Sequence, residues 1–111
     1  MADHRVFELR TYYATPGNLD RLQQRFRDHT VALFARHGME LVAFFTPADG
    51  DAEVLTYLMA YPDRVTADAA WDAFRADPDW VAAKSASEVD GSLVDHLDST
   101  FLQPTDLSPL R

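Results

Sequence analysis

The stretch Pro16 to Gly38, PGNLDRLQQRFRDHTVALFARHG, decides the fold, because it has the pattern of one amphipathic helix of about six turns. With successive residues roughly 100° apart, one narrow arc of this helix is mostly apolar. That arc contains Leu19, Leu22, Phe26, His29 and Leu33. Pro16 suits a first helical turn, and Gly38 suits the left-handed conformation that ends a helix. We therefore expect a long helix that packs this face, with His29 on it, against a sheet.

The segments on both sides of this helix have the pattern of strands. Arg5 to Tyr13 alternates between two faces. Met39 to Thr46 and Glu53 to Tyr61 are apolar and separated by the turn sequence PADGD, which is typical of an antiparallel hairpin. His96 to Gln103 is rich enough in Thr, Phe and Leu for a fourth strand at a sheet edge.

The second helical region is divided in two. Asp63 or Thr66 can cap a helix that ends near Ala76, and Asp77 followed by Pro78 predicts a new helix to about Val89. The order of elements indicates an α+β, ferredoxin-like βαββαβ fold with a four-stranded antiparallel sheet. We expect residues 1–103 to form one domain, followed by a C-terminal tail at residues 104–111.

In such a fold the helices cover only one face of the sheet. We expect Val6, Tyr12 and the neighbouring Glu8 and Arg10 to lie on the uncovered face, because that side of the first strand mixes apolar and charged residues. Pairing of two copies through this face would bury it in a homodimer.

The composition excludes several classes of partner. The net charge of −8 and the single lysine argue against binding to nucleic acid or to an anionic membrane. No apolar run approaches the length of a membrane-spanning helix, Met1 to Arg5 contains no apolar signal core, and cysteine is absent. We therefore expect a cytoplasmic protein.

Several separated motifs resemble one known family. They are ELRTY at 8–12, PG at 16–17, FRxHT at 26–30, RHGM at 36–39, AWxAFRADPxW at 70–80 and FLxPTDLS at 101–108. Together they resemble the NIPSNAP family of dimeric α+β barrel proteins, over nearly the whole chain. The resemblance implies a ferredoxin-like subunit that pairs into a barrel. It implies no single activity, because structural relatives include cofactor-independent monooxygenases, haem-degrading enzymes, lactone isomerases, polyketide cyclases and proteins with no known reaction.

His29 is the candidate catalytic residue, since it lies on the apolar face of the long helix. A neutral imidazole that points toward the sheet could act as a general acid or base near pH 7. The alternative is a structural histidine in the core, hydrogen-bonded to a backbone carbonyl or to a tyrosine such as Tyr57 or Tyr13.

The candidate substrate-binding residues are Arg10, Tyr12, Tyr57 and Trp71. Arg10 could bind a carboxylate or an enolate through two parallel hydrogen bonds, and the aromatic residues could line a cavity for a planar molecule. The alternatives are a structural ion pair of Glu8 and Arg10 across the dimer interface, and ordinary core packing of the aromatic rings. The scattered histidines and the absence of phosphate-binding loops predict no metal site and no nucleotide cofactor.

Three functional hypotheses remain open at this stage. The first is a homodimer that binds a small hydrophobic or aromatic metabolite between sheet and helices, with cofactor-independent acid–base catalysis of the isomerase, cyclase or monooxygenase type by His29. The second is a ligand-binding or interaction module without turnover. The third is a haem-binding or haem-degrading protein that uses a helix histidine.

Overall fold

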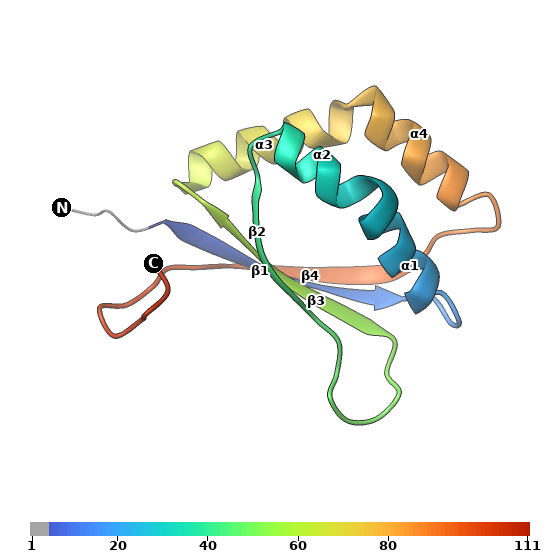
Figure 1. The fold of residues 1–111 in the computed structure, drawn as a ribbon, viewed down its shortest axis with the longest axis horizontal. Helices are drawn as coiled ribbons and strands as arrows, with labels where there is room; N and C mark the ends of the chain where they lie inside the picture. The colour runs from blue at the N-terminus through green and yellow to red at the C-terminus, as the bar shows by residue number, and fades with distance from the viewer. Residues whose placement is uncertain (1–4) are drawn as a thin grey trace.

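The computed structural model describes residues 5–111 and consists of one antiparallel sheet with all its helices on one face (Figure 1). The sheet order is β2-β3-β1-β4. The four strands are β1 (Val6–Ala14), β2 (Glu40–Phe45), β3 (Val54–Tyr61) and β4 (Val94–Leu102). This order confirms the expected ferredoxin-like βαββαβ fold of the α+β class. Met1 to His4, part of the segment without an apolar signal core, lie outside the described residues.

The helices follow the expected pattern, including the divided second helix. The first helical region is continuous and consists of α1 (Leu19–Arg25), η1 (Phe26–Thr30) and α2 (Val31–Arg36). The second consists of α3 (Arg64–Ala76) and α4 (Pro78–Ser87). The two residues predicted to start them are both N-caps: Asp63 accepts a hydrogen bond from the Thr66 amide, and Asp77 accepts one from the Asp79 amide. No helix in residues 5–111 combines the length and the apolarity that crossing a bilayer requires.

A π-helical turn in the middle of the long helix changes which residues face the sheet. Within η1 the Val31 amide donates to the Phe26 carbonyl, five residues earlier instead of four. This wider turn delays the inward face by about one residue. Thr30 is therefore buried, with 3% of its surface exposed, whereas His29 is exposed to solvent. The expected inward orientation of His29 is wrong, because it assumed an uninterrupted α-helix.

Both ends of the long helix are bound by specific contacts. At its end, Gly38 has a φ of 68°, and the Met39 amide donates to the Phe34 carbonyl, which is the Schellman pattern. At its start, the carboxylate of Glu53 accepts hydrogen bonds from the amides of Gly17 (2.8 Å) and Leu19 (3.4 Å). Glu53 precedes β3, so the hairpin loop caps the helix in place of a residue from the helix itself.

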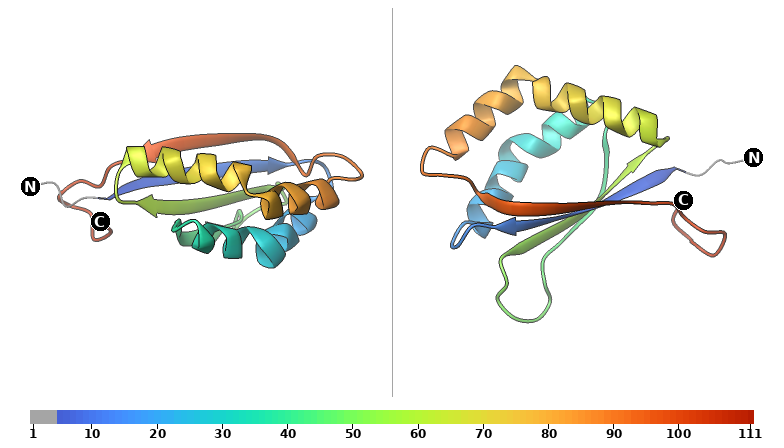
Figure 2. Two further views of the ribbon diagram at one scale, coloured as in Figure 1. Left: turned by 90° about the horizontal axis from the view of Figure 1, so that it is seen from above. Right: turned by 180° about the vertical axis from the view of Figure 1, so that it is seen from behind.

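The two faces of β1 are the reverse of the prediction. Glu8, Arg10 and Tyr12 lie under the helices, where Glu8 accepts a hydrogen bond from Trp71 of α3. The predicted position on the uncovered face was wrong, because the Glu8–Arg10 pair suggested a face outside the subunit's own core. The face that no helix covers (Figure 2) instead carries the alternate residues of β1 and their neighbours on the other strands. They include Phe7, Leu9, Thr11, Tyr13, Val54, Thr56, Leu58, Phe45 and Leu102.

The core lies between the sheet and the helices and is largely aromatic. Tyr57 at its centre is fully buried and contacts Phe26 and Phe34 of the long helix, with ring centroids 5.2 Å and 6.1 Å away. Phe34 in turn contacts Trp71 and Phe74 of α3. These ring contacts join both helical regions to the middle of the sheet. Residues 104–111 turn back toward β1, where Nε of Arg5 donates to the Arg111 carbonyl; the domain boundary at residue 103 stays a prediction.

Candidate functional site

A cleft of about 960 Å³ lies between the two helical regions and the sheet. Its floor comes from β1 and β4, one wall from α1, η1 and α2, and the other wall from α3 and α4. Aromatic rings and cationic side chains dominate the lining. It includes Tyr12, Phe26, Phe34, Trp71, Phe74 and Trp80, together with Arg10, Arg25, Arg75 and Lys84. The two carboxylates on the lining are Glu88 and Asp95.

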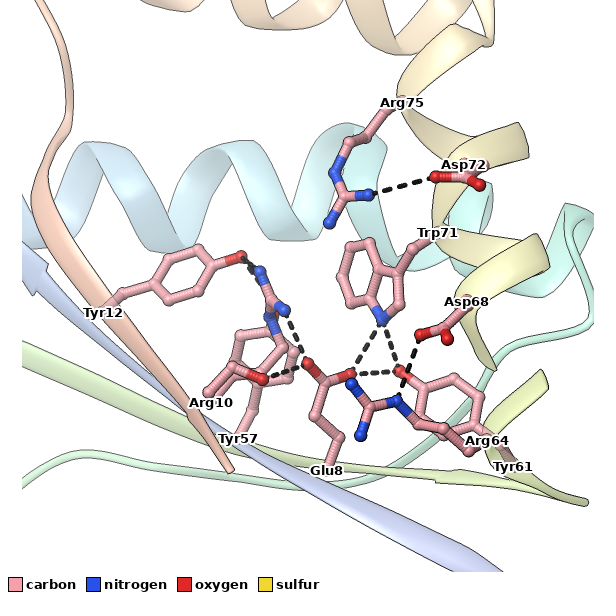
Figure 3. Close-up of polar contacts among 11 residues, drawn as sticks. Glu8, Arg10, Tyr12, Tyr57, Tyr61, Arg64, Asp68, Trp71, Asp72 and Arg75 are labelled. Carbon is pink, nitrogen blue, oxygen red and sulfur yellow. Dashed lines mark hydrogen bonds and ion pairs between the residues drawn. The ribbon is translucent and has the colours of Figure 1, made fainter. Parts of the chain in front are cut away.

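A buried polar network centred on the carboxylate of Glu8 underlies the floor of this cleft (Figure 3). One carboxylate oxygen accepts hydrogen bonds from the Tyr61 hydroxyl (2.7 Å) and the Trp71 indole (2.8 Å). The other accepts from Nη1 of Arg10 (2.7 Å) and from the Ser99 hydroxyl. Glu8 thus has four donors and needs no ligand to satisfy it. Its role is to hold Arg10.

Arg10 connects this carboxylate to two tyrosines. Its Nε donates to the hydroxyl of Tyr57 (2.9 Å), and its Nη2 donates to the hydroxyl of Tyr12 (3.0 Å). The Tyr57 hydroxyl also lies 2.8 Å from that of Tyr12. Tyr57 is fully buried, so its single hydroxyl hydrogen must be donated, and Tyr12 is the acceptor in reach.

The direction of these bonds leaves one donor free at the cleft. The Tyr12 oxygen accepts from both Arg10 and Tyr57, and its own hydrogen has no acceptor among the described residues. Tyr12 lines the cleft, with 9% of its surface exposed. A ligand oxygen at this position would receive a hydrogen bond from a hydroxyl that a guanidinium polarises.

The charges in the network are fixed near neutral pH. Burial raises the pKa of Glu8, but hydrogen bonds from Ser99 and Tyr61 and the charge of Arg10 outweigh it, so the pKa is lowered overall. For Arg10, burial acts against the charge, and Tyr57, Tyr12 and Glu8 together raise its pKa. Burial raises the pKa of Tyr57 and of Tyr61 well above the usual value. Both tyrosines therefore stay protonated and act as hydrogen-bond donors.

Around the cleft, two guanidinium groups pack against tryptophan rings. The Arg10 guanidinium carbon lies 4.1 Å from the Trp71 ring centroid, and that of Arg25 lies 5.1 Å from the Trp80 centroid. Phe74 lies between the two tryptophans, 5.4 Å from Trp71 and 4.8 Å from Trp80. Both tryptophans of the chain thus border the cleft.

The structure brings together three of the four expected substrate-binding residues. Arg10, Tyr12 and Trp71 line the cleft. Tyr57 does not line it but is hydrogen-bonded to Tyr12, which does. His29 does not line the cleft. The haem hypothesis depended on a helix histidine that points into the cleft, and His29 does not. His37, at the end of α2, contacts another partner instead, because its Nε2 lies 2.8 Å from the Asp77 carboxylate.

Sequence reasoning missed Arg25, which is 6% exposed and lines the cleft. A signal for it was present, because three residues after Leu22 a helix has turned to about 60° from that residue, at the border of the apolar arc. A cation at that border, with an acidic residue elsewhere to pair with it, predicts a buried ion pair. Glu88 of the connection after α4 is that partner, at 3.1 Å.

A model of the NIPSNAP family matches residues 7–109 of the chain. Among curated proteins, none matches the sequence. The solved structures that share the fold include three NIPSNAP family or domain proteins. An uncharacterised NIPSNAP domain protein from Burkholderia xenovorans is 25% identical with a TM-score of 0.80, and the match covers 94% of this chain and 98% of that one.

The other two are NIPSNAP family proteins from Agrobacterium tumefaciens. One, described as having unknown function, is 22% identical with a TM-score of 0.86, and the match covers 100% of this chain and 97% of that one. The second is 23% identical with a TM-score of 0.85, with 97% and 100% covered. Identities at this level relate the folds of the proteins and carry no information on a ligand.

Proposed function

The chain belongs to the NIPSNAP family, and from the geometry of its cleft we propose that it is a homodimeric protein that binds a small, aromatic, oxygen-bearing metabolite between sheet and helices. The observation that carries this proposal is the free hydroxyl hydrogen of Tyr12, held in place by Arg10 and Tyr57 at the floor of an aromatic cleft. The cytoplasmic location expected from the sequence stays a prediction.

The size and lining of the cleft support a metabolite as the ligand. A volume of about 960 Å³ is at the upper end of the range of about 300–1,000 Å³ that is usual for small-molecule pockets. Trp71, Phe74 and Trp80 offer flat apolar surfaces, which suit a planar ring system. The Tyr12 hydroxyl supplies the directional contact that would fix the orientation of an oxygen on that ring system.

The uncovered sheet face supports the homodimer. Leu9 and Leu58 lie directly opposite each other on the two central strands, and both are half-buried in the single subunit. Phe45 and Leu102 toward the two edges are 54% and 44% exposed. Exposed apolar side chains on a face that no helix covers are typical of an interface, and two-fold pairing of the same face on two copies would bury them.

Binding can be tested with a pair of matched probes, 2-acetylnaphthalene and 2-ethylnaphthalene, which differ in the carbonyl oxygen. We expect isothermal titration calorimetry to detect both, with Tyr12→Phe weakening the binding of acetylnaphthalene about tenfold and leaving that of ethylnaphthalene unchanged. Tyr13→Phe is the control, because that hydroxyl donates to Asp98 on the opposite face of the sheet. Failure of both probes to bind the unmodified protein would contradict the proposed function.

A second candidate, catalysis without a cofactor, is favoured by the same hydroxyl group. A hydrogen bond from Tyr12, strengthened by Arg10, would stabilise the negative charge that develops on a carbonyl oxygen when the adjacent carbon loses a proton to solvent. The test is deuterium incorporation from heavy water into the methyl group of 2-acetylnaphthalene, followed by NMR. Catalysis predicts faster deuterium incorporation with the unmodified protein than with Tyr12→Phe. Equal rates would contradict catalysis and leave ligand binding as the proposed function.

A further inference from the structure

We propose that the metabolite bound in the cleft carries a carboxylate group, and that Arg25 binds this group through the Nε and Nη2 edge of its guanidinium. This inference rests on the proposed function, since it names the chemical class of the molecule that the cleft accepts.

The hydrogen bonds of Arg25 are incomplete in a specific way. Its Nη1 donates to the Ser87 hydroxyl and to the Glu88 carboxylate, both at 3.1 Å. Its Nε is fully buried and has no hydrogen-bond partner among residues 5–111. Buried donors are nearly always paired in folded proteins, because an unpaired one has lost its water without replacement. An open donor on a side chain that is 5% exposed and lines a cleft therefore indicates a ligand contact.

The charges around the cleft favour an anion. The whole chain has a net charge of −8, yet four cationic side chains and only two carboxylates line this cleft. Arg10 is already neutralised by Glu8, and Arg75 has an exposed partner in Asp72. Arg25 shares Glu88 with Lys84, whose Nζ lies 3.7 Å from the other carboxylate oxygen. Asp95, the other carboxylate of the lining, contacts His96. Around Glu88 itself, one carboxylate lies between two cations, which leaves positive charge for a ligand.

The shape of the open donor set selects a carboxylate. The Nε and Nη2 edge of a guanidinium presents two parallel N–H groups, which match the two oxygens of one carboxylate. A phosphate would bring a second negative charge and a third oxygen beside Glu88. The Trp80 ring next to Arg25, and Phe74 next to Trp80, place flat apolar surface beside the anion position. The indicated class is an aromatic carboxylic acid.

The experiment compares 2-naphthoate with the neutral 2-naphthamide by isothermal titration calorimetry on the full chain. We expect naphthoate to bind the unmodified protein at least about tenfold more tightly than naphthamide. Arg25→Lys keeps the charge and a partner for Glu88 but removes the pair of parallel N–H donors, so it should weaken naphthoate binding more than naphthamide binding and abolish this preference. Arg21→Lys, one turn earlier on α1 and exposed, is the matched control and should keep the preference.

The outcomes separate this inference from the proposed function. Equal binding of the two probes to the unmodified protein would overturn the carboxylate site, even if the variant failed to fold, while binding of both would still support the proposed function. A preference for naphthoate that persists in Arg25→Lys would also overturn it, because the anion would then bind elsewhere. If neither probe binds, the proposed function fails together with this inference.

Discussion

The hydroxyl of Tyr57 donates a 2.8 Å hydrogen bond to the hydroxyl of Tyr12. The two tyrosines lie on neighbouring strands, and in this bond Tyr57 is the donor and Tyr12 the acceptor. Tyr57 is completely enclosed and accepts from Nε of Arg10, while Tyr12 borders the cleft. The inner tyrosine therefore has a structural role, and the outer one is placed to contact a ligand.

This difference predicts unequal effects of removing each hydroxyl. Tyr57→Phe leaves a buried donor of Arg10 without an acceptor and should lower the free energy of unfolding by about 1–3 kcal/mol. Tyr12→Phe removes the acceptor of both Arg10 and Tyr57 but should cost less, about 1 kcal/mol, because water in the cleft can replace the lost oxygen as a partner for both. Chemical denaturation measures both values. Equal losses would contradict the assigned roles.

The Glu8–Arg10 pair predicts a large loss of stability when its charge balance is broken. Glu8→Gln leaves the Arg10 cation without its 2.7 Å counter-charge in a site where both side chains are nearly fully buried. We expect the free energy of unfolding to fall by about 3–5 kcal/mol. The control is Glu40→Gln, which removes an exposed ion pair with Arg5 and should cost less than about 1 kcal/mol. A similar loss in both variants would show that burial of the first pair has little consequence.

The lowered pKa of Glu8 predicts how stability depends on pH. Its ordinary pKa is 4.5, and the folded-state value is lower, since the hydrogen bonds and the charge of Arg10 outweigh the effect of burial. A carboxyl group of this kind stabilises the folded state above its unfolded-state pKa and loses that contribution as the pH falls through its folded-state pKa. The unfolding free energy should therefore decrease below about pH 4.5.

Glu8→Gln isolates this contribution. Asp63 and Asp77 also have lowered pKa values, but they are present in both proteins and cancel in the comparison. We expect the stability gap between the unmodified protein and Glu8→Gln to narrow as the pH falls from about 6 to about 3, measured by denaturation at each pH. A gap that stays constant over this range would show that Glu8 is not the titrating group.

The π turn predicts that His29 is dispensable for folding. His29→Ala should change the free energy of unfolding by less than about 0.5 kcal/mol, because the imidazole is exposed. Leu22→Ala, about two turns earlier on the buried side, should cost about 2–5 kcal/mol. Thermal denaturation compares the two variants. A loss of more than about 1 kcal/mol for His29→Ala would contradict the exposed position of the imidazole.

The uncovered sheet face predicts the oligomeric state. The unmodified protein should have twice the 12.5 kDa subunit mass in light scattering coupled to gel filtration. Leu58→Arg puts a charge in the middle of that face and should give the subunit mass. Val65→Arg changes an exposed residue of α3 on the other side of the molecule and should leave the dimer intact. A subunit mass for the unmodified protein would contradict the dimer.

The architecture could be predicted from the sequence because its signals are local. The caps at Asp63 and Asp77, the glycine at 38 and the turn between the two hairpin strands mark where elements begin and end, and all of these positions agree with the structure. The strand order then follows from the small number of ways in which these elements can connect.

The site was only partly predictable, for two physical reasons. The π turn contains neither glycine nor proline, so nothing in FRDHT shows that the helix widens there and directs His29 outward. Charged residues on a strand usually indicate solvent or an interface. Arg10 is close to Glu8 on β1, but the other three donors to Glu8 come from β3, α3 and β4, far away in the sequence. Tertiary partners of this kind cannot be read from local spacing.

The Glu53 carboxylate, which binds the amides of Gly17 and Leu19, has a consequence for motion in the cleft. It ties the hairpin to the first turn of the helix that carries Arg25, so fraying of that turn and opening of the loop should occur as a single event. In hydrogen exchange, Glu53→Ala should speed the loss of protection at both amides together, and a ligand seated against Arg25 should slow it from a distance.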